Sequence, residues 1–233
     1  MRRLRPLLAL LGLVTIAALV IAAAVLAPPH PRGAQHTYGY SLSVSTNATL
    51  QDVRIDVPIP ETPDGRSPIA DAIAAGSAEV PAGWTATVER TQRGLVLRLA
   101  AEEVRPGRRA DGRTYETYEV RVSVPTDRAI ETGDPFGTEP TIATPETLRE
   151  RPCPNVVNPD PGTTCYAFDA TVSVAYEAPR TASVTAYLVT AGSTTLPSTT
   201  DGHRQYYERL SMAFDGPQDG QQVVVGFART EAE

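Results

Sequence analysis

Few residues in this chain have types and spacing that could carry chemistry, and the two cysteines are the clearest. Cys153 and Cys165 are the only cysteines among 233 residues, and they flank a segment rich in proline and asparagine. Outside the cytoplasm, where thiols are oxidised, such a pair predicts a disulfide, and closing a loop of this size contributes roughly 3 kcal/mol. We predict that bridge rather than a redox pair or a zinc site, because two sulfurs without neighbouring histidines do not complete a tetrahedral metal site.

Two further groups of polar residues are candidate sites. His203, Tyr206 and Tyr207 gather an imidazole and two phenols that could bind a polar ligand or a sugar by stacking and hydrogen bonding. We favour a simpler interpretation, a turn that leads into a strand with tyrosines at the margin of a sheet. Asn47 begins the sequon Asn-Ala-Thr and is a candidate N-glycosylation site, although a plain turn asparagine explains it equally well.

Signatures of catalysis are missing from the sequence. It contains no nucleophile elbow, P-loop, dinucleotide-binding glycine motif or paired-histidine zinc motif. His30 and His36 precede the predicted folded domain, which leaves His203 as the single histidine within it. We therefore predict no catalytic, cofactor-binding or metal-ligating residue, and we expect that the chain is not an enzyme.

Acidic pairs and an arginine cluster are the remaining charged features. Glu102 with Glu103, and Asp215 with Asp219, could suggest the two carboxylates of a hydrolase or a calcium site, but chance pairs are common on an acidic chain. The four arginines between residues 105 and 113 could contact acidic glycans or lipid headgroups. A solvated hairpin tip with acidic partners is the interpretation that we favour.

The balance of charged residues indicates which kinds of partner and of genome fit this chain. All 21 basic side chains are arginine, against 27 acidic ones. Arg2, Arg3 and Arg5 are the only charges before residue 28, which leaves residues 28–233 with a net charge of −9. This excludes nucleic acid as a partner, because neutralising phosphates needs a basic face. The lysine-free composition fits a GC-rich genome of either a halophilic archaeon or an actinobacterium.

The N-terminus predicts a membrane segment. Residues 1–6 carry the three arginines, and residues 7–27 form an uncharged run that would span roughly 30 Å as a helix, enough to cross the lipid bilayer. Positive charges before the run place the N-terminus in the cytoplasm and the rest of the chain outside, as a single-pass cell-membrane protein. The alternative is secretion after cleavage of a signal peptide, for example after Ala24.

Alternating apolar residues predict nine strands beyond a proline-rich tether at residues 28–36. The alternating sets begin at Tyr38, Val53, Trp84, Leu95, Tyr118, Tyr166, Val184, Leu210 and Val223. Each set is expected to be the buried face of its strand, including Val223, Val225 and Phe227 in the last one. We predict an extracytoplasmic antiparallel β-sandwich over residues 37–230, with a barrel as the alternative, and a hairpin that turns at Asn47.

One short helix is expected between the strands. Ser67 can cap it, Pro68 suits its first position, Ile69 and Ile73 share one face, and Gly76 can end it. The helix is predicted to cap the sheet rather than to form a domain.

A long connection without strand periodicity covers residues 125–164, which contain 8 of the 21 prolines. A second helical turn is expected to begin at Thr144 within it. Connections of this length are uncommon unless they are functional or cross-linked, and the predicted disulfide supplies the cross-link.

The order of these features carries a resemblance. An arginine-rich start, a single span and a proline tether lead into residues 40–50, YSLSVSTNATL, and then into Val57-Pro58-Ile59-Pro60. This arrangement resembles uncharacterised single-span exported β-rich proteins of halophilic archaea. The resemblance covers roughly the first 60 residues and the lysine-free composition. It implies no activity.

Together these features predict a membrane-anchored, extracytoplasmic structural or protein-interaction module at the cell surface. Contact with another surface protein is expected through an exposed strand edge or the disulfide loop. The alternative is a module that binds cell-wall glycan or another ligand, for which clustered surface aromatics would be the sign. A carboxylate-dependent hydrolase is less favoured.

Overall fold

The computed structural model describes residues 34–107, 117–154, 162–196 and 203–231. The predicted cytoplasmic and membrane-spanning segments, most of the tether, and three of the four arginines between residues 105 and 113 lie outside these ranges. Within them, no helix has the length and apolar character that crossing a bilayer requires.

The described chain is mainly antiparallel β-structure, as the alternation predicts. Nine of its ten strands correspond to the nine predicted ones, and the tenth is a two-residue strand in the long connection. The strands are β1 (Gln35–Thr46), β2 (Leu50–Pro58), β3 (Thr85–Thr91), β4 (Gly94–Val104), β5 (Tyr118–Thr126), β6 (Arg149–Glu150), β7 (Thr163–Glu177), β8 (Ser183–Thr195), β9 (His203–Asp215) and β10 (Gln218–Glu231). Since β1 begins at Gln35, the last two residues of the predicted tether belong to the sheet.

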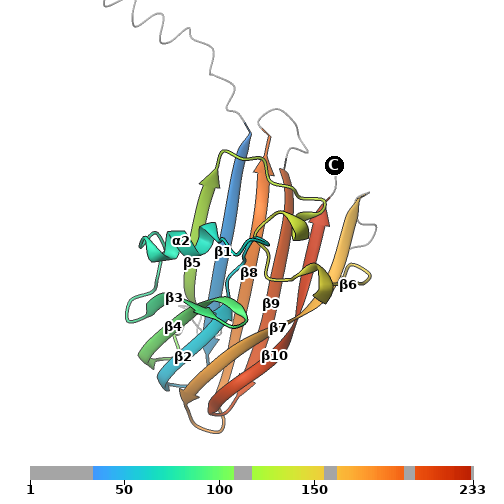
Figure 1. Ribbon diagram of the computed structural model, residues 1–233. Coiled ribbons are helices and arrows are strands. Elements are labelled where there is room, and N and C mark those ends of the chain that lie inside the picture. Colours follow the sequence, from blue (N-terminus) through green and yellow to red (C-terminus); the bar gives the residue numbers. More distant parts are fainter. Residues whose placement is uncertain (1–33, 108–116, 155–161, 197–202, 232–233) are drawn as a thin grey trace, which may run out of the picture. The chain divides into compact units, whose positions relative to one another are not determined.

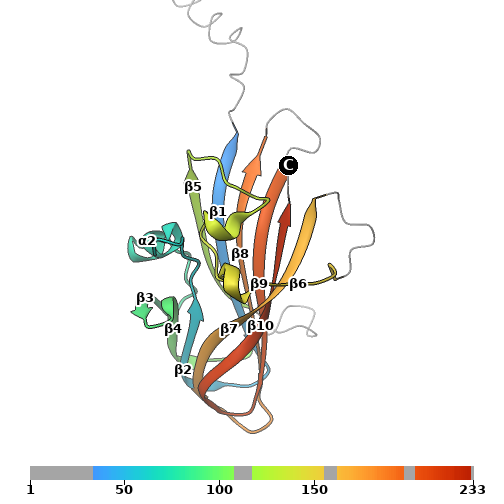
Figure 2. The same cartoon turned by 45° about the vertical axis from the view of Figure 1, so that its right-hand side comes forward.

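All ten strands belong to one sheet, which curls into a half-barrel (Figures 1 and 2). The order is β3-β4-β2-β7-β10-β9-β8-β1-β5, with β6 added to β7. Each strand in this order is hydrogen-bonded to the next, so the division into two separate sheets that a sandwich requires is not confirmed.

The chain leaves β1 at a corner and not at a hairpin. β1 pairs with β5 and β8, whereas β2 pairs with β4 and β7, so the predicted β1–β2 hairpin is wrong. Asn47 makes the corner: its backbone N–H donates to the carbonyl of Ser183, and its side-chain oxygen accepts from the N–H of Ser183 at 2.7 Å. These bonds tie the corner to the start of β8, a distant partner that local turn residues do not identify.

The predicted helix is confirmed as α2 (Pro68–Ala74). Ser67 caps it by accepting a hydrogen bond from the N–H of Ala70 at 3.1 Å, and Ile69 and Ile73 are buried. Gly76 follows with φ of +76°, a conformation that side chains with a Cβ rarely adopt. The second predicted turn is the 3₁₀ helix η2 (Pro145–Thr147).

α2 and the segment after it cover the open side of the half-barrel, between the edge strands β3 and β5. Glu79 exchanges two backbone hydrogen bonds with Arg121 of β5. Trp84, next to β3, packs on Tyr118 of β5 with ring centres 5.7 Å apart. These contacts shield the backbone of β5 at its outer edge.

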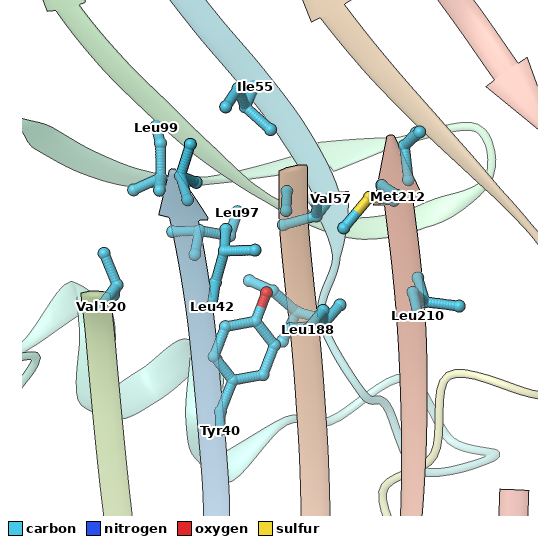
Figure 3. Close-up of a cluster of buried hydrophobic side chains, with 14 of the residues drawn as sticks. Tyr40, Leu42, Ile55, Val57, Leu97, Leu99, Val120, Leu188, Leu210 and Met212 are labelled. Carbon is cyan, nitrogen blue, oxygen red and sulfur yellow. The ribbon is translucent and has the colours of Figure 1, made fainter. Parts of the chain in front are cut away.

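The hydrophobic core lies inside the curl, where strands distant in the order face each other (Figure 3). Leu42 of β1, Leu188 of β8 and Leu210 of β9 point toward Val57 of β2 and Leu97 of β4, and none of the five is exposed. Each fully buried side chain of this size contributes roughly 1.5–3 kcal/mol, so the core holds the two halves of the sheet together.

Candidate functional site

The feature of the described surface that most resembles a binding site is part of one strand, residues 218–225 of β10, which we call the β10 edge. β10 pairs with β7 over its whole length, from Gln218 to Glu231. It pairs with β9 only between Gly226 and Arg229. The β10 edge therefore has one strand neighbour, and the N–H and C=O groups that point away from β7 have no strand partner among the described residues.

The edge exists because two strands that follow one another in sequence diverge. After Leu210, β9 continues to pair with β8 as far as Asp215, whereas the first half of β10 pairs with β7 (Figures 1 and 2). Gly216, with φ of +68°, lies in the turn between the two strands.

The β10 edge also carries exposed apolar side chains. Val223 is 69% exposed and Val225 is 61% exposed, and the one other large hydrophobic residue with comparable exposure in the described chain is Tyr187 at 40%. Exposed hydrophobic residues beside unpaired backbone are the combination that strand-adding interfaces use.

The prediction that Val223, Val225 and Phe227 form the buried face of the last strand is wrong for the two valines, whereas Phe227 is buried at 8% exposure. Gly226 and Ala228 face the core instead, because the ring of Phe168 fills the space where a larger side chain would lie. A Cβ atom on Gly226 would come within 2.4 Å of that ring. The valines therefore lie on the outward face, and Phe227, although outward, is covered by Tyr207 and Arg209.

The edge carries no charge from Gly220 to Val225, and the nearest charged residue on the same strand is Asp219. Proteins usually protect an edge with charged side chains, proline or a covering segment. The two terminal strands of this sheet follow that pattern: β3 carries Glu89 and Arg90, and β5 carries Arg121 and its bridge to the segment after α2.

A solvent-open groove of about 480 Å³ adjoins the β10 edge, between the β3–β4 turn, η2 and the outward face of β7. Its charged groups already have protein partners. Asp169 accepts two hydrogen bonds from Arg149, at 2.8 and 3.0 Å, and Arg93 donates to Gln221 at 2.7 Å. Burial pulls the pKa of Asp56 upward, but hydrogen bonds from arginines of β4 and β2 outweigh it and hold the pKa below its usual value.

Glu208 is a fully buried carboxylate on β9. Its two oxygens accept the backbone N–H groups of Ile142 and Ala143, at 2.7 and 2.8 Å. Burial outweighs these two bonds and raises the pKa of Glu208 to about 7. Glu208 therefore fastens the long connection to the sheet.

A second buried carboxylate, Glu139, fastens the same connection nearby. It accepts hydrogen bonds from the hydroxyl of Tyr38 and the guanidinium of Arg128, both at 2.6 Å, and from the N–H of Glu131 at 3.0 Å. Glu139 is 1% exposed. Both buried carboxylates are thus occupied and covered, which leaves neither free to attack or protonate a substrate.

The residues of the predicted ligand patch do not come together on the surface. Tyr206 is buried at 1% exposure and donates to the carbonyl of Pro140 at 2.8 Å, whereas Tyr207 lies on the opposite face of β9, and His203 is exposed at the start of the strand.

The predicted disulfide between Cys153 and Cys165 is present. The side chain of Asn47 is exposed, and its amide also donates to the carbonyl of Thr181 at 3.4 Å. No group of three or more possible metal ligands occurs among the residues that the structure describes.

Comparison of the chain with models of protein families, with curated proteins and with solved structures found no match. The candidate function therefore depends on the geometry of this chain alone.

Proposed function

We propose that this chain is a non-enzymatic module that binds an extended strand of a second protein chain along the β10 edge. The observation that carries the proposal is the eight-residue edge with unpaired backbone and two exposed valines. Main-chain hydrogen bonds would supply the affinity, and the alternate side chains of the added strand would supply the specificity. The partners of the groove charges and of the buried carboxylates favour binding over catalysis.

The module acts, in this proposal, outside the cytoplasm and close to the membrane. The disulfide favours an oxidising compartment, and the arginines followed by the apolar run at residues 7–27 favour a single-pass anchor with the N-terminus inside.

We also propose that the half of the molecule around the diverging strands is organised as a sandwich of two layers. One layer is β9-β8-β1-β5, and the other is β10-β7-β2-β4-β3. The separation of β9 from β10 below Leu210 and the shared core between Leu42 and Leu97 support this description. The β10 edge would then be the margin of one layer.

The test uses the full chain in detergent micelles and a fluorescent peptide of eight alternating threonine and valine residues. Anisotropy should rise with wild-type protein, because the peptide can pair with the edge. The double variant Val223→Asp/Val225→Asp should lose most of this binding, since both side chains are exposed and the fold should be kept. The matched control Tyr187→Asp changes an exposed residue on a strand paired on both sides and should bind like wild type. Equal binding by the double variant would refute the proposal.

A further inference from the structure

We propose that the strand taken up by the β10 edge is the same edge of a second copy of this chain, paired antiparallel about a two-fold axis. This inference rests on the proposed function of the edge and names its partner. Three observations carry it: the unpaired backbone, the uncharged sequence and the outward valines of the β10 edge.

Two-fold symmetry makes one β10 edge the complement of another. In an antiparallel pair with a two-fold axis, residue i of one chain meets residue j of the other, and j meets i. The unpaired N–H and C=O groups of one copy are then satisfied by the same groups of its partner. With the axis at Gln222, Val223 or Val224, the two edges overlap over 219–225, 221–225 or 223–225, a paired length of roughly 10–24 Å.

The charge distribution selects this edge over the rest of the surface. With a net charge of −9 over residues 28–233, two copies repel each other across most of their surfaces. Between Gly220 and Val225 the strand itself carries no charge. Among the described residues, the one charged group bonded to it is the guanidinium of Arg93, which donates to the side chain of Gln221. A two-fold axis at Gln222, Val223 or Val224 places Asp219 opposite Val225, Phe227 or Arg229 respectively, so Asp219 does not meet a second acid across the pair.

The edges formed by the two terminal strands of the sheet are poorer sites for a second copy. β3 carries adjacent opposite charges at Glu89 and Arg90, and β5 is occupied at Arg121 by the segment after α2. Pairing through the β10 edge also brings Val223 and Val225 of both copies onto one outward face. With the axis at Val223 or Val224, valines of the two copies lie directly opposite each other.

The expected dimer is weak. A strand pair with four valines buries less than the roughly 1,600 Å² of a standard stable interface, so its formation should depend on protein concentration. Such a dimer would be in equilibrium with single chains whose edges are free.

The symmetry gives a sharp test. Because neighbouring residues point to opposite faces of a sheet, a two-fold axis places a single residue of the strand opposite its own copy. Both native cysteines are in the disulfide, so five single-cysteine variants of the full chain, at positions 221 to 225, can be oxidised one at a time in detergent micelles. Tyr187→Cys is the control for random collision, since its position is also exposed and its strand is paired on both sides.

The expected result is one maximum of cross-linked dimer, at position 222, 223 or 224, well above the Tyr187→Cys level. In each cysteine variant, Val223 and Val225 can also be replaced by aspartate wherever they have not become cysteine. This change should weaken dimerisation roughly tenfold, because aspartates of the two copies then lie close together on one face. A flat profile at the control level, together with a monomer mass at all concentrations in sedimentation, would overturn the inference. If the threonine–valine peptide still bound in that case, the edge function would stand with a different partner, whereas loss of both would reject both proposals.

Discussion

Replacing Glu208 by glutamine should remove a pH dependence of stability. The Glu208 carboxyl has a pKa of about 7 in the folded chain, against 4.5 for the ordinary group, because burial disfavours its charge. The folded state thus holds the proton more tightly than the unfolded state. This stabilisation is fully present below pH 4.5 and is lost as the pH rises through about 7.

The size of the effect follows from the same two pKa values. The difference between them corresponds to about 3 kcal/mol of stability, lost mostly between pH 4.5 and 7. For a chain of this length that is a fall of roughly 6–12 °C in Tm. The glutamine does not titrate, so the difference in Tm between wild type and Glu208→Gln should change by this amount between pH 4 and pH 8.

Fluorescence of Trp84, the only tryptophan, reports unfolding because the ring is buried. Glu177→Gln, an exposed carboxyl at the end of β7, is the matched control and should keep the wild-type pH profile. Parallel melting profiles of wild type and Glu208→Gln from pH 4 to pH 8 would show that Glu208 does not titrate in this range, and the reasoning from burial would fail.

Two further predictions concern packing and the cross-link. Gly226→Ala should lower the free energy of unfolding by about 2 kcal/mol, because its Cβ would lie 2.4 Å from Phe168. Gly39→Ala is the control and should have the Tm of wild type, because there is open space around it. Equal Tm values for the two variants would contradict this account. The Cys153→Ala/Cys165→Ala variant should lose roughly 3 kcal/mol of unfolding free energy, seen as a lower Tm. A reducing agent should lower the Tm of wild type but not that of the variant. An unchanged wild-type Tm would argue against a stabilising bridge.

Much of the fold could be predicted from local pattern. Alternation located nine strands, and the cap at Ser67, proline at the first position and Gly76 located α2. These signals are local because they depend on backbone geometry within a few residues. The disulfide could be predicted for a different reason, because a chain with two cysteines has only one possible pair within it.

The site could not be predicted in the same way, since it depends on residues far apart in sequence. The run Val223-Val224-Val225 has no alternation, and the face it buries is decided by Phe168 on β7, which leaves room only for Gly226. Whether β10 keeps its neighbour β9 is decided by the pairing of β9 with β8. Likewise, Asn47 is a corner because of Ser183, and Tyr206 is buried because the long connection covers it.

The pairing of β1 has a consequence for the order in which the chain can fold. β1 lies between β5 and β8, and its residue Gln35 pairs with Thr195. At ordinary rates of synthesis, on the order of 10 s separate the appearance of these two residues. During that interval, Tyr40 and Leu42 lack the β8 wall that later covers them, so the first strand to be made is among the last to be enclosed. β1 can therefore complete its pairing with β8 only after residues as far as Thr195 have been made.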